Sequence, residues 1–358
     1  MKTFHCDHCQ QLVFFENVQC VKCGHLLAYV AEVDDVLSLE SPGENVWHSN
    51  AKDGSQQYKL CQNYCQQSVC NWALAADSQG EFCESCRLTK VIPDLSVAGH
   101  KEKWFLLEAA KRRLLYSLLR LNLPIASKAD DPNSGLAFEF LADDTAPGAK
   151  RVLTGHNNGL ITINLAEADD AEREKRRLAM HEPYRTLLGH FRHEIGHYYW
   201  DRMIRGTEWT NRFRELFGNE EADYSKALQA YYKTGAPADW QERFVSAYAS
   251  SHPWEDWAET WTHYLHMSDV LETAAASGLW LRPQRPDEPA LAPVARKRSG
   301  RPEKFETMIE NWFPLTYVLN NLNRGMGLHD AYPFVISPPA IEKLRFIHER
   351  ICSLATNQ

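Results

Sequence analysis

His193-Glu194-Ile195-Gly196-His197 forms an H-E-x-x-H pattern near the middle of the chain. No proline interrupts residues 184–200 around it, and the apolar residues there recur at helical spacing, which predicts a helix. Two histidines four residues apart lie on one face of a helix, so both imidazoles can reach one Zn²⁺. Glu194 lies beside that face, where a carboxylate can accept a proton from a metal-activated water. The pattern therefore predicts hydrolysis assisted by a metal ion.

A catalytic zinc ion needs a third protein ligand, and a later segment that starts at Pro253 offers one. Proline suits the first turn of a helix. One stripe of this helix is apolar and predicts core packing: Trp254, Trp257, Trp261 and Leu265. The opposed stripe carries Glu255, Glu259 and His263. We expect Glu255 to bind the ion and Glu259 to accept a hydrogen bond from a ligand histidine, because carboxylates beside a core need a cation or a donor. A solvated helical face is the alternative.

Two other acidic positions compete for a role at this centre. Residues 219–223, Asn-Glu-Glu-Ala-Asp, lie nearer to the histidines in sequence, but acidic residues at a helix start also act as caps, and we assign them to capping. Asp201 falls one turn beyond His197. We expect it to support the ligands from outside the metal sphere.

Nine of the ten cysteines precede residue 87, and Cys352 is expected to be a buried thiol. The first four form two C-x₂-C pairs and predict a closed structural zinc site: Cys6, Cys9, Cys20 and Cys23. A second structural zinc site is predicted from Cys61, Cys70, Cys83 and Cys86. Cys65 is the spare thiol in this interpretation, although it could replace Cys61 or Cys70.

A zinc site with four cysteine ligands has no open position, so these two sites cannot carry the hydrolysis. They can fold a small region that lacks a core, and a zinc ribbon can also bind a partner. The segment between the two cysteine clusters is acidic, with Glu32, Asp34, Asp35 and Glu40. We therefore expect a structural role or a protein partner rather than nucleic acid.

The whole chain has 358 residues and a net charge of −8, so no basic field points to nucleic acid. Its apolar runs are too short to span a membrane. Residues 1–5 lead directly into the first cysteine pair, with no apolar signal segment, which predicts a cytoplasmic protein. The length allows two or three domains.

The remaining segments predict ordinary elements. Helices are expected over 104–123, ended by Pro124, and over 305–322 and 340–354. Strands are expected over 136–141 and 152–165, with a hairpin turn at Asn157-Asn158-Gly159. The charged run 167–177 predicts a solvated helical face, and the proline-rich segment 283–302 predicts a loop.

Two resemblances add to these predictions. Residues 193–197 and 255–259 resemble the gluzincin metallopeptidases, and residues 248–259 resemble those of the anthrax lethal-factor type. In that type a tyrosine seven residues before the ligand glutamate stabilises the transition state, and Tyr248 has this position before Glu255. Over nearly its full length, the chain resembles a bacterial family of zinc-binding metallopeptidases with an amino-terminal zinc ribbon. The stretches that carry this resemblance are 83–95, 154–170, 184–201, 244–267 and 311–334.

These resemblances imply an α+β fold, with a mainly helical zincin-like domain over 99–358. A small sheet has an edge strand that pairs with the substrate, for which we expect residues 160–165. A zinc ribbon over 1–30 and a second Cys-rich module over 31–98 precede this domain. We expect one catalytic and two structural zinc ions, a peptide or protein substrate, and Tyr248, with His263 as a second candidate, at the reacting oxygen. The alternative is a non-catalytic zinc-ribbon protein that binds protein or nucleic acid; Glu194 and Tyr248 favour the enzyme.

Overall fold

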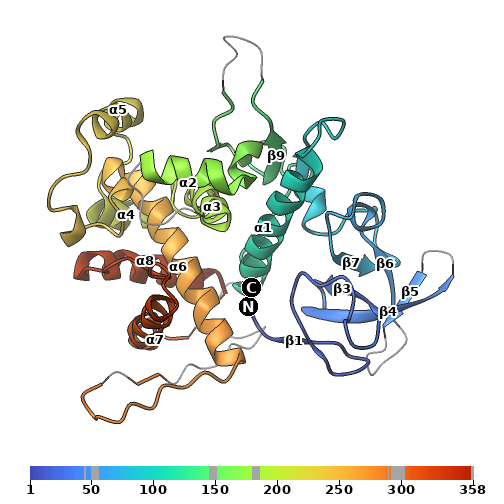
Figure 1. Cartoon of the computed structure of the whole chain (residues 1–358). Coiled ribbons are helices and arrows are strands. Elements are labelled where there is room, and N and C mark those ends of the chain that lie inside the picture. The colour runs from blue at the N-terminus through green and yellow to red at the C-terminus, as the bar shows by residue number, and fades with distance from the viewer. Residues whose placement is uncertain are drawn as a thin grey trace.

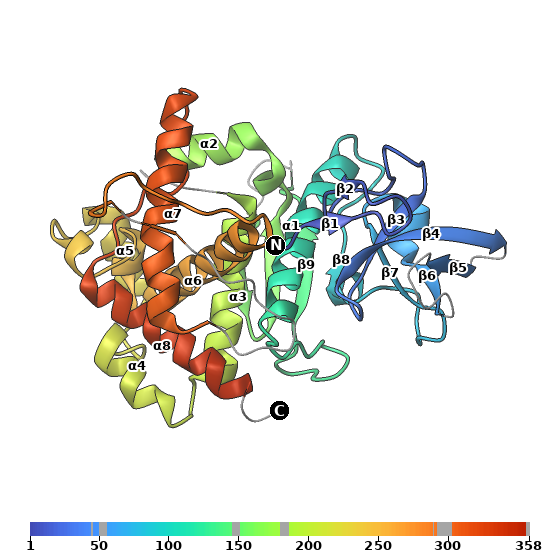
Figure 2. The ribbon, with the colours of Figure 1, turned by 90° about the horizontal axis from the view of Figure 1, so that it is seen from below.

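The computed structural model describes residues 1–43, 46–49, 56–144, 151–179, 186–288, 290–291 and 303–355. A β-rich N-terminal part lies beside a larger, mainly helical part, and helix α1 (His100–Arg120) stands between them (Figures 1 and 2). In the described residues, no helix has both the length and the apolar character needed to cross a bilayer.

The N-terminal part is a closed five-stranded barrel with a short two-stranded ribbon beside it. The ribbon pairs β1 (Phe4–His5) with β2 (Leu12–Val13). The barrel strands are β3 (Leu26–Val30), β4 (Asp35–Gly43), β5 (Val46–Ser49), β6 (Gln57–Leu60) and β7 (Trp72–Ala75). Tyr29 on β3 lies opposite Trp72 on β7, and this parallel pairing closes the barrel. The boundary predicted after residue 30 therefore falls between two paired strands, and both cysteine clusters belong to one unit.

An aromatic cluster joins the barrel to α1. Phe4, Phe15 and Tyr29 each pack against Tyr116 of α1, with ring centroids 5.5 to 6.3 Å apart. The apolar stripe predicted for α1 is buried as expected: Leu107, Ala110, Leu114, Leu118 and Leu121. Edge-to-face aromatic packing of this kind contributes beyond the area that it buries. The barrel residues Tyr29 and Trp72 thus belong to the same core as the helical part, whereas a second, smaller core cluster lies within the barrel strands alone.

The sheet of the helical part has the strand order β10-β11-β9-β8. Its strands are β8 (Thr89–Val91), β9 (Ala137–Leu141), β10 (Gly155–Asn157) and β11 (Leu160–Asn164). The hairpin predicted at residues 157–159 is confirmed, with positive φ at Asn158 and Gly159, as a tight turn requires. A Cβ on Gly159 would lie 2.2 Å from the Gly135 carbonyl oxygen, so only glycine fits there.

The prediction that residues 160–165 form an edge strand of this sheet is wrong. Residues 160–164 lie between β10 and β9, because the hairpin folds β10 back onto their outer side. The two edge strands of this sheet are therefore β10 and β8. The sheet also includes residues 89–91, which were predicted to belong to the preceding module.

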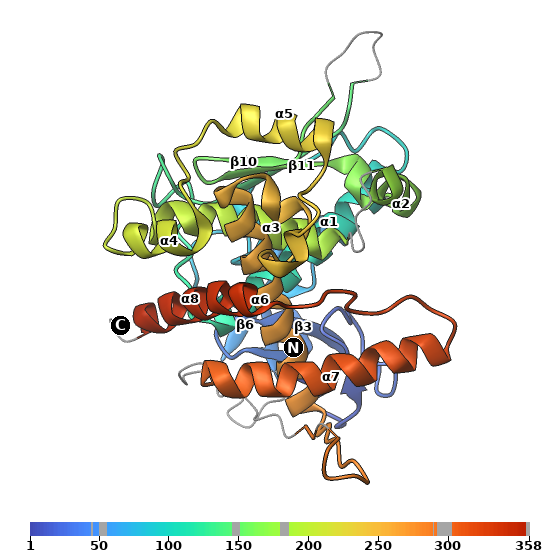
Figure 3. The ribbon, with the colours of Figure 1, turned by 90° about the vertical axis from the view of Figure 1, so that its left-hand side faces the viewer.

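In the described part of the chain, α1 is followed by further helices: α2 (Asp170–Ala179), α3 (Leu187–Met203), α4 (Trp209–Phe217), α5 (Tyr224–Thr234), α6 (Pro253–Ala276), α7 (Phe305–Gly325) and α8 (Pro338–Ala355). The long helix α6 runs through the helical part and packs against α3, α7 and α8 (Figure 3). The solvated helical face predicted for residues 167–177 is present in α2. Glu167, just before α2, is instead buried and contacts His190. Of the predicted loop 283–302, residues 289 and 292–302 lie outside the described residues.

Candidate metal centre

Helices α3 and α6 bring His193, His197 and Glu255 together, with one donor atom of each within 4.8 Å of the others. Glu255 Oε2 lies 3.0 Å from His193 Nε2, and Glu255 Oε1 lies 3.6 Å from His197 Nε2. The carboxylate is almost completely buried. Two imidazole nitrogens and one carboxylate are the donor set of a catalytic zinc site.

Local sequence explains why the two helices present these groups. Thr186 caps α3 through a hydrogen bond from the Gly189 N–H, and His252 caps α6 through one from the Trp254 N–H. Glu255 falls in the first turn of α6, where the helix dipole favours a negative charge. Gly196 allows the helices to approach closely, since a Cβ there would lie 3.1 Å from the Cα of Ala258.

His193 is oriented by a second carboxylate on α6. Its Nδ1 lies 2.8 Å from Glu259 Oε1, and the Ser246 hydroxyl donates to Glu259 Oε2 at 2.7 Å. The hydrogen bond expected for Glu259 is therefore present, and it leaves Nε2 of His193 facing Glu255. Ser246 was not predicted, because nothing in its sequence surroundings marks it.

The pKa values of the two histidines shift in opposite directions. Burial lowers the pKa of His193, but its hydrogen bonds with Glu255 and Glu259 more than offset this, and its pKa lies well above the ordinary value. Burial lowers the pKa of His197 to about 3, so that its ring is neutral and one of its two nitrogens has a free lone pair. The carboxylates of Glu255 and Glu259 thus favour a cation near the point where the three donors meet.

Glu194 lies beside the centre and is mostly buried. Burial raises its pKa to about 7, although the neighbouring His193 charge opposes the shift. A carboxylate that titrates near neutral pH is suited to accept a proton and to return it.

Two tyrosines lie close to the centre. Tyr248 begins a short 3₁₀ segment, Tyr248–Ser251, and its ring centroid lies 5.9 Å from that of His193. The hydroxyl of Tyr224, the first residue of α5, donates to Glu255 Oε1 at 2.7 Å. Tyr224 was not predicted, although it directly follows the acidic stretch 219–223. In that stretch Asp223 caps α5 as expected, whereas Glu220 and Glu221 pair with Arg214.

Three expectations around the centre need correction. Asp201 makes an ion pair with Arg205 at 2.8 Å, because its side chain points along α3 toward the following turn. His263 is buried two turns beyond Glu255, where its Nδ1 lies 2.5 Å from the Tyr332 hydroxyl, so it does not reach the donors. Trp254 is only half-buried and its ring lies 4.4 Å from the His197 ring, whereas Trp257 and Trp261 are in the core as expected.

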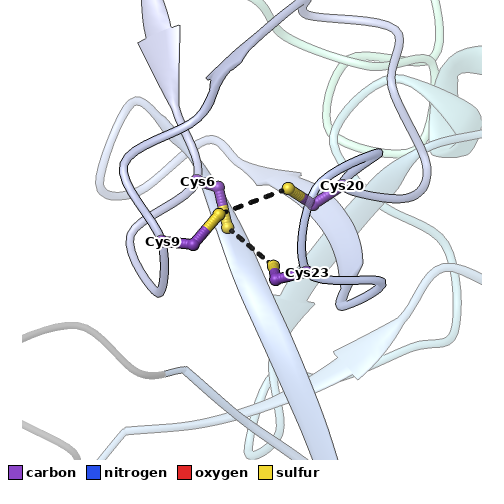
Figure 4. A group of neighbouring side chains, drawn as sticks. All are labelled: Cys6, Cys9, Cys20 and Cys23. Carbon is purple, nitrogen blue, oxygen red and sulfur yellow. Dashed lines mark hydrogen bonds between the residues drawn. The ribbon is translucent and has the colours of Figure 1, made fainter.

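Both predicted groups of four cysteines come together in the N-terminal part, in segments next to the barrel strands. Figure 4 shows Cys6 and Cys9 facing Cys20 and Cys23, with Sγ atoms 3.6 Å apart across the two pairs. Cys61, Cys70, Cys83 and Cys86 form the second group, all buried, while Cys65 is exposed and lies outside it. Backbone N–H groups of Trp72 and Cys86 donate to sulfurs of this group, as they do around metal-bound thiolates.

A further cluster on the barrel was not predicted. His25 Nε2 lies 2.6 Å from Glu40 Oε1, and the ring of His8 stacks on that of His25 at 3.9 Å. Glu40 and His8 are exposed, and the contact between His25 and Glu40 is a hydrogen bond at the surface.

Comparisons with known proteins agree with the two-part architecture. Residues 100–350 match a family model described as "Putative zinc-binding metallo-peptidase", and residues 3–97 match one described as "zinc-ribbon domain". Uncharacterized proteins of Mycobacterium bovis and Mycobacterium tuberculosis are 45% identical over 357 residues, which cover 99% of this chain and 96% of theirs. No solved structure matches the chain.

Proposed function

The chain belongs to the metallo-peptidase family whose model spans residues 100–350, and from this we propose that it hydrolyses peptide or amide bonds with a zinc ion. The observation that carries the proposal is the convergence of His193, His197 and Glu255, with Glu194 beside them. The proposal also assigns a structural zinc ion to each group of four cysteines.

The residues of the centre fit a zinc ion. Three protein donors are the number found in catalytic zinc sites, which keep a further position open. Oε2 of Glu255 is buried and accepts no hydrogen bond among the described residues, and it lies 3.0 Å from His193 Nε2, so a cation at this point would satisfy both atoms. A bound zinc ion would supply Lewis acidity that activates a water molecule and polarises the substrate carbonyl group.

The side chains around the donors have distinct tasks in this proposal. Glu194 accepts a proton from the attacking water and then donates it to the nitrogen of the departing amine. The Tyr248 hydroxyl donates a hydrogen bond to the carbonyl oxygen as negative charge develops on it. Glu259 holds His193 in the tautomer that presents Nε2.

Strand β10 offers a binding edge for an extended substrate. It is the last strand of its sheet, and it packs against α3, the helix that carries both histidines. A peptide added to this edge would be held by main-chain hydrogen bonds next to the donors. The substrate class that fits is therefore an extended peptide segment. The barrel, which stands apart from this edge, is proposed to bind a protein partner.

The Glu194→Gln substitution tests the proposal. The amide that replaces the carboxylate cannot accept the proton, so hydrolysis should fall by about 10²–10⁴-fold. The zinc content should stay at three ions per chain, because Glu194 is not a donor in this centre. The measurement is unbiased cleavage-site profiling of a peptide library with wild type and variant, alongside metal analysis of both.

The same experiment separates the enzyme from the non-catalytic alternative. Cleavage by the wild type at sites that the variant leaves intact supports hydrolysis at this centre. Equal cleavage by both proteins refutes the mechanism. The third outcome is two tightly held zinc ions per chain, no third exchangeable ion and no cleavage. It would support the alternative, a zinc-ribbon binding protein without catalysis.

A further inference from the structure

Helix α5 reaches the metal centre through its first residue. It lies at the rim of the helical part, away from the barrel (Figures 1 and 3). The Tyr224 hydroxyl donates to Glu255 Oε1 at 2.7 Å, and the Tyr224 ring lies edge-on to His252 and Trp254. These two residues flank the start of α6. The segment that positions Glu255 therefore also positions the hydroxyl that contacts it.

The two oxygens of Glu255 have different surroundings. Oε2 lies 3.0 Å from His193 Nε2, on the side where the donors meet. Oε1 accepts the hydrogen bond from Tyr224 and is farther, 3.6 Å, from His197 Nε2. A hydroxyl donor on Oε1 leaves Oε2 as the oxygen that faces an ion. A carboxylate held in this way contributes one donor atom and leaves room for water.

The rest of α5 is loosely attached. None of its residues is buried, and its N-terminal turn is held by the Ala222 carbonyl, which accepts a hydrogen bond from His252 at 3.1 Å. One turn from its end, Tyr231 packs edge-on against Tyr248, with ring centroids 5.7 Å apart. Two tyrosines of one helix thus contact a donor of the centre and the tyrosine proposed to face the substrate.

We propose that Tyr224 is a positioning residue, which holds the Glu255 carboxylate so that a single oxygen faces the metal ion. Helix α5 then links this carboxylate to Tyr248 through Tyr231. The kinetic consequence rests on the proposed function, but the effect on metal binding does not. Hydrogen-bond partners of metal ligands orient those ligands and tune the affinity of the site.

The test is the Tyr224→Phe variant of the full chain, which keeps the ring packing and removes only the hydroxyl. Zinc affinity at the exchangeable site is measured without substrate, by competition with a chromophoric chelator while the cysteine sites stay loaded. We expect the variant to bind zinc about 10–100-fold more weakly. Tyr317→Phe on α7 is the control, because the Tyr317 side chain is exposed and lies on a helix that supplies none of the three donors.

A spectroscopic and a kinetic readout separate positioning from substrate binding. With Co²⁺ in the exchangeable site, the visible absorption should change in Tyr224→Phe and not in Tyr317→Phe, since the ligand geometry changes only in the first. At saturating zinc, kcat should fall while KM stays within about twofold, as expected when no substrate contact is lost.

The outcomes distinguish this proposal from the proposed function. If Tyr224→Phe binds zinc as tightly as the wild type and gives the same Co²⁺ spectrum, the positioning role is refuted, whatever the activity. If its zinc affinity falls but the wild type cleaves nothing, the positioning role stands and the hydrolase proposal fails. A raised KM with unchanged zinc affinity would instead make Tyr224 a substrate contact.

Discussion

At the residue scale, the centre depends on how each histidine nitrogen is assigned. Glu259 accepts from Nδ1 of His193, so that Nε2 is the nitrogen directed toward Glu255. Ser246 in turn donates to the other oxygen of Glu259. This chain of contacts fixes one tautomer and one ring orientation, which is how outer carboxylates raise the affinity of a metal site.

Removing the Glu259 carboxylate should therefore weaken the centre. We expect Glu259→Ala to lower zinc affinity at the exchangeable site by about 10–100-fold, because the His193 ring loses its orienting acceptor. Glu259→Gln should retain most of the affinity, since its amide oxygen accepts the same hydrogen bond. Chelator competition measures both variants. Equal affinities in Glu259→Ala and the wild type would show that packing alone holds the ring.

Sequence predicted the residues of the centre that repeat along helices. The i, i+4 spacing of His193 and His197, and of Glu255 and Glu259, fixes each pair on one face before any tertiary contact is known. Tyr224 and Ser246 could not be predicted in this way, since each contacts α6 across a turn that no periodicity describes. The role predicted for His263 at the reacting oxygen was wrong. His263 shares the helical stripe of Glu255 but lies two turns away, about 12 Å along the axis.

At the element scale, α3 and α6 pack face to face through Gly196. A Cβ there would lie 3.1 Å from the Ala258 backbone, and the Trp257 indole N–H donates to the Gly196 carbonyl oxygen at 2.8 Å. The glycine lowers helix propensity by about 1 kcal/mol, but it lets the helices that carry the donors come close together.

A larger side chain at this crossing should push the helices apart. We expect Gly196→Val to lower the free energy of unfolding by about 1–3 kcal/mol, because the backbone of α6 cannot rearrange like a flexible side chain. Urea unfolding measures the change. Gly325→Val near the end of α7 is the control, since no atom lies within 4 Å of its added Cβ. Equal stabilities of the two variants would contradict tight packing at Gly196.

Elements with local patterns were predicted, and the barrel was not. The α1 stripe and the 157–159 turn are encoded within short windows, and both appear in the structure. Barrel closure depends on Tyr29 lying opposite Trp72, on two strands that are far apart in sequence. The cysteine spacing correctly predicted which cysteines come together in two groups of four. It carried no information on the strands that join the two groups into one unit.

At the scale of the whole molecule, a buried arginine joins the barrel to the helical part. Arg120 of α1 contacts Asp34 of the barrel at 2.8 Å and Glu272 of α6 at 2.7 Å, and all three side chains are buried. The same interface has an exposed ion pair between Arg113 and Glu16. Because α6 also carries Glu255, the buried arginine connects the barrel to the helix of the metal centre.

Replacing Arg120 by leucine should destabilise the whole chain. Two buried carboxylates would lose their shared cation, which costs about 3–5 kcal/mol when one partner of a buried ion pair is removed. Arg113→Leu at the exposed pair should cost about 0–1 kcal/mol, since solvent screens that pair. Urea unfolding of both variants at neutral pH measures the difference. In the double variant Arg120→Leu/Asp34→Asn, part of the lost stability should return, because Asp34 pairs with no other cation among the described residues, whereas Glu272 keeps the N-terminal ammonium at 3.3 Å. A single-variant effect no larger than that of Arg113→Leu would show that the aromatic cluster, rather than the ion pairs, holds the two parts together.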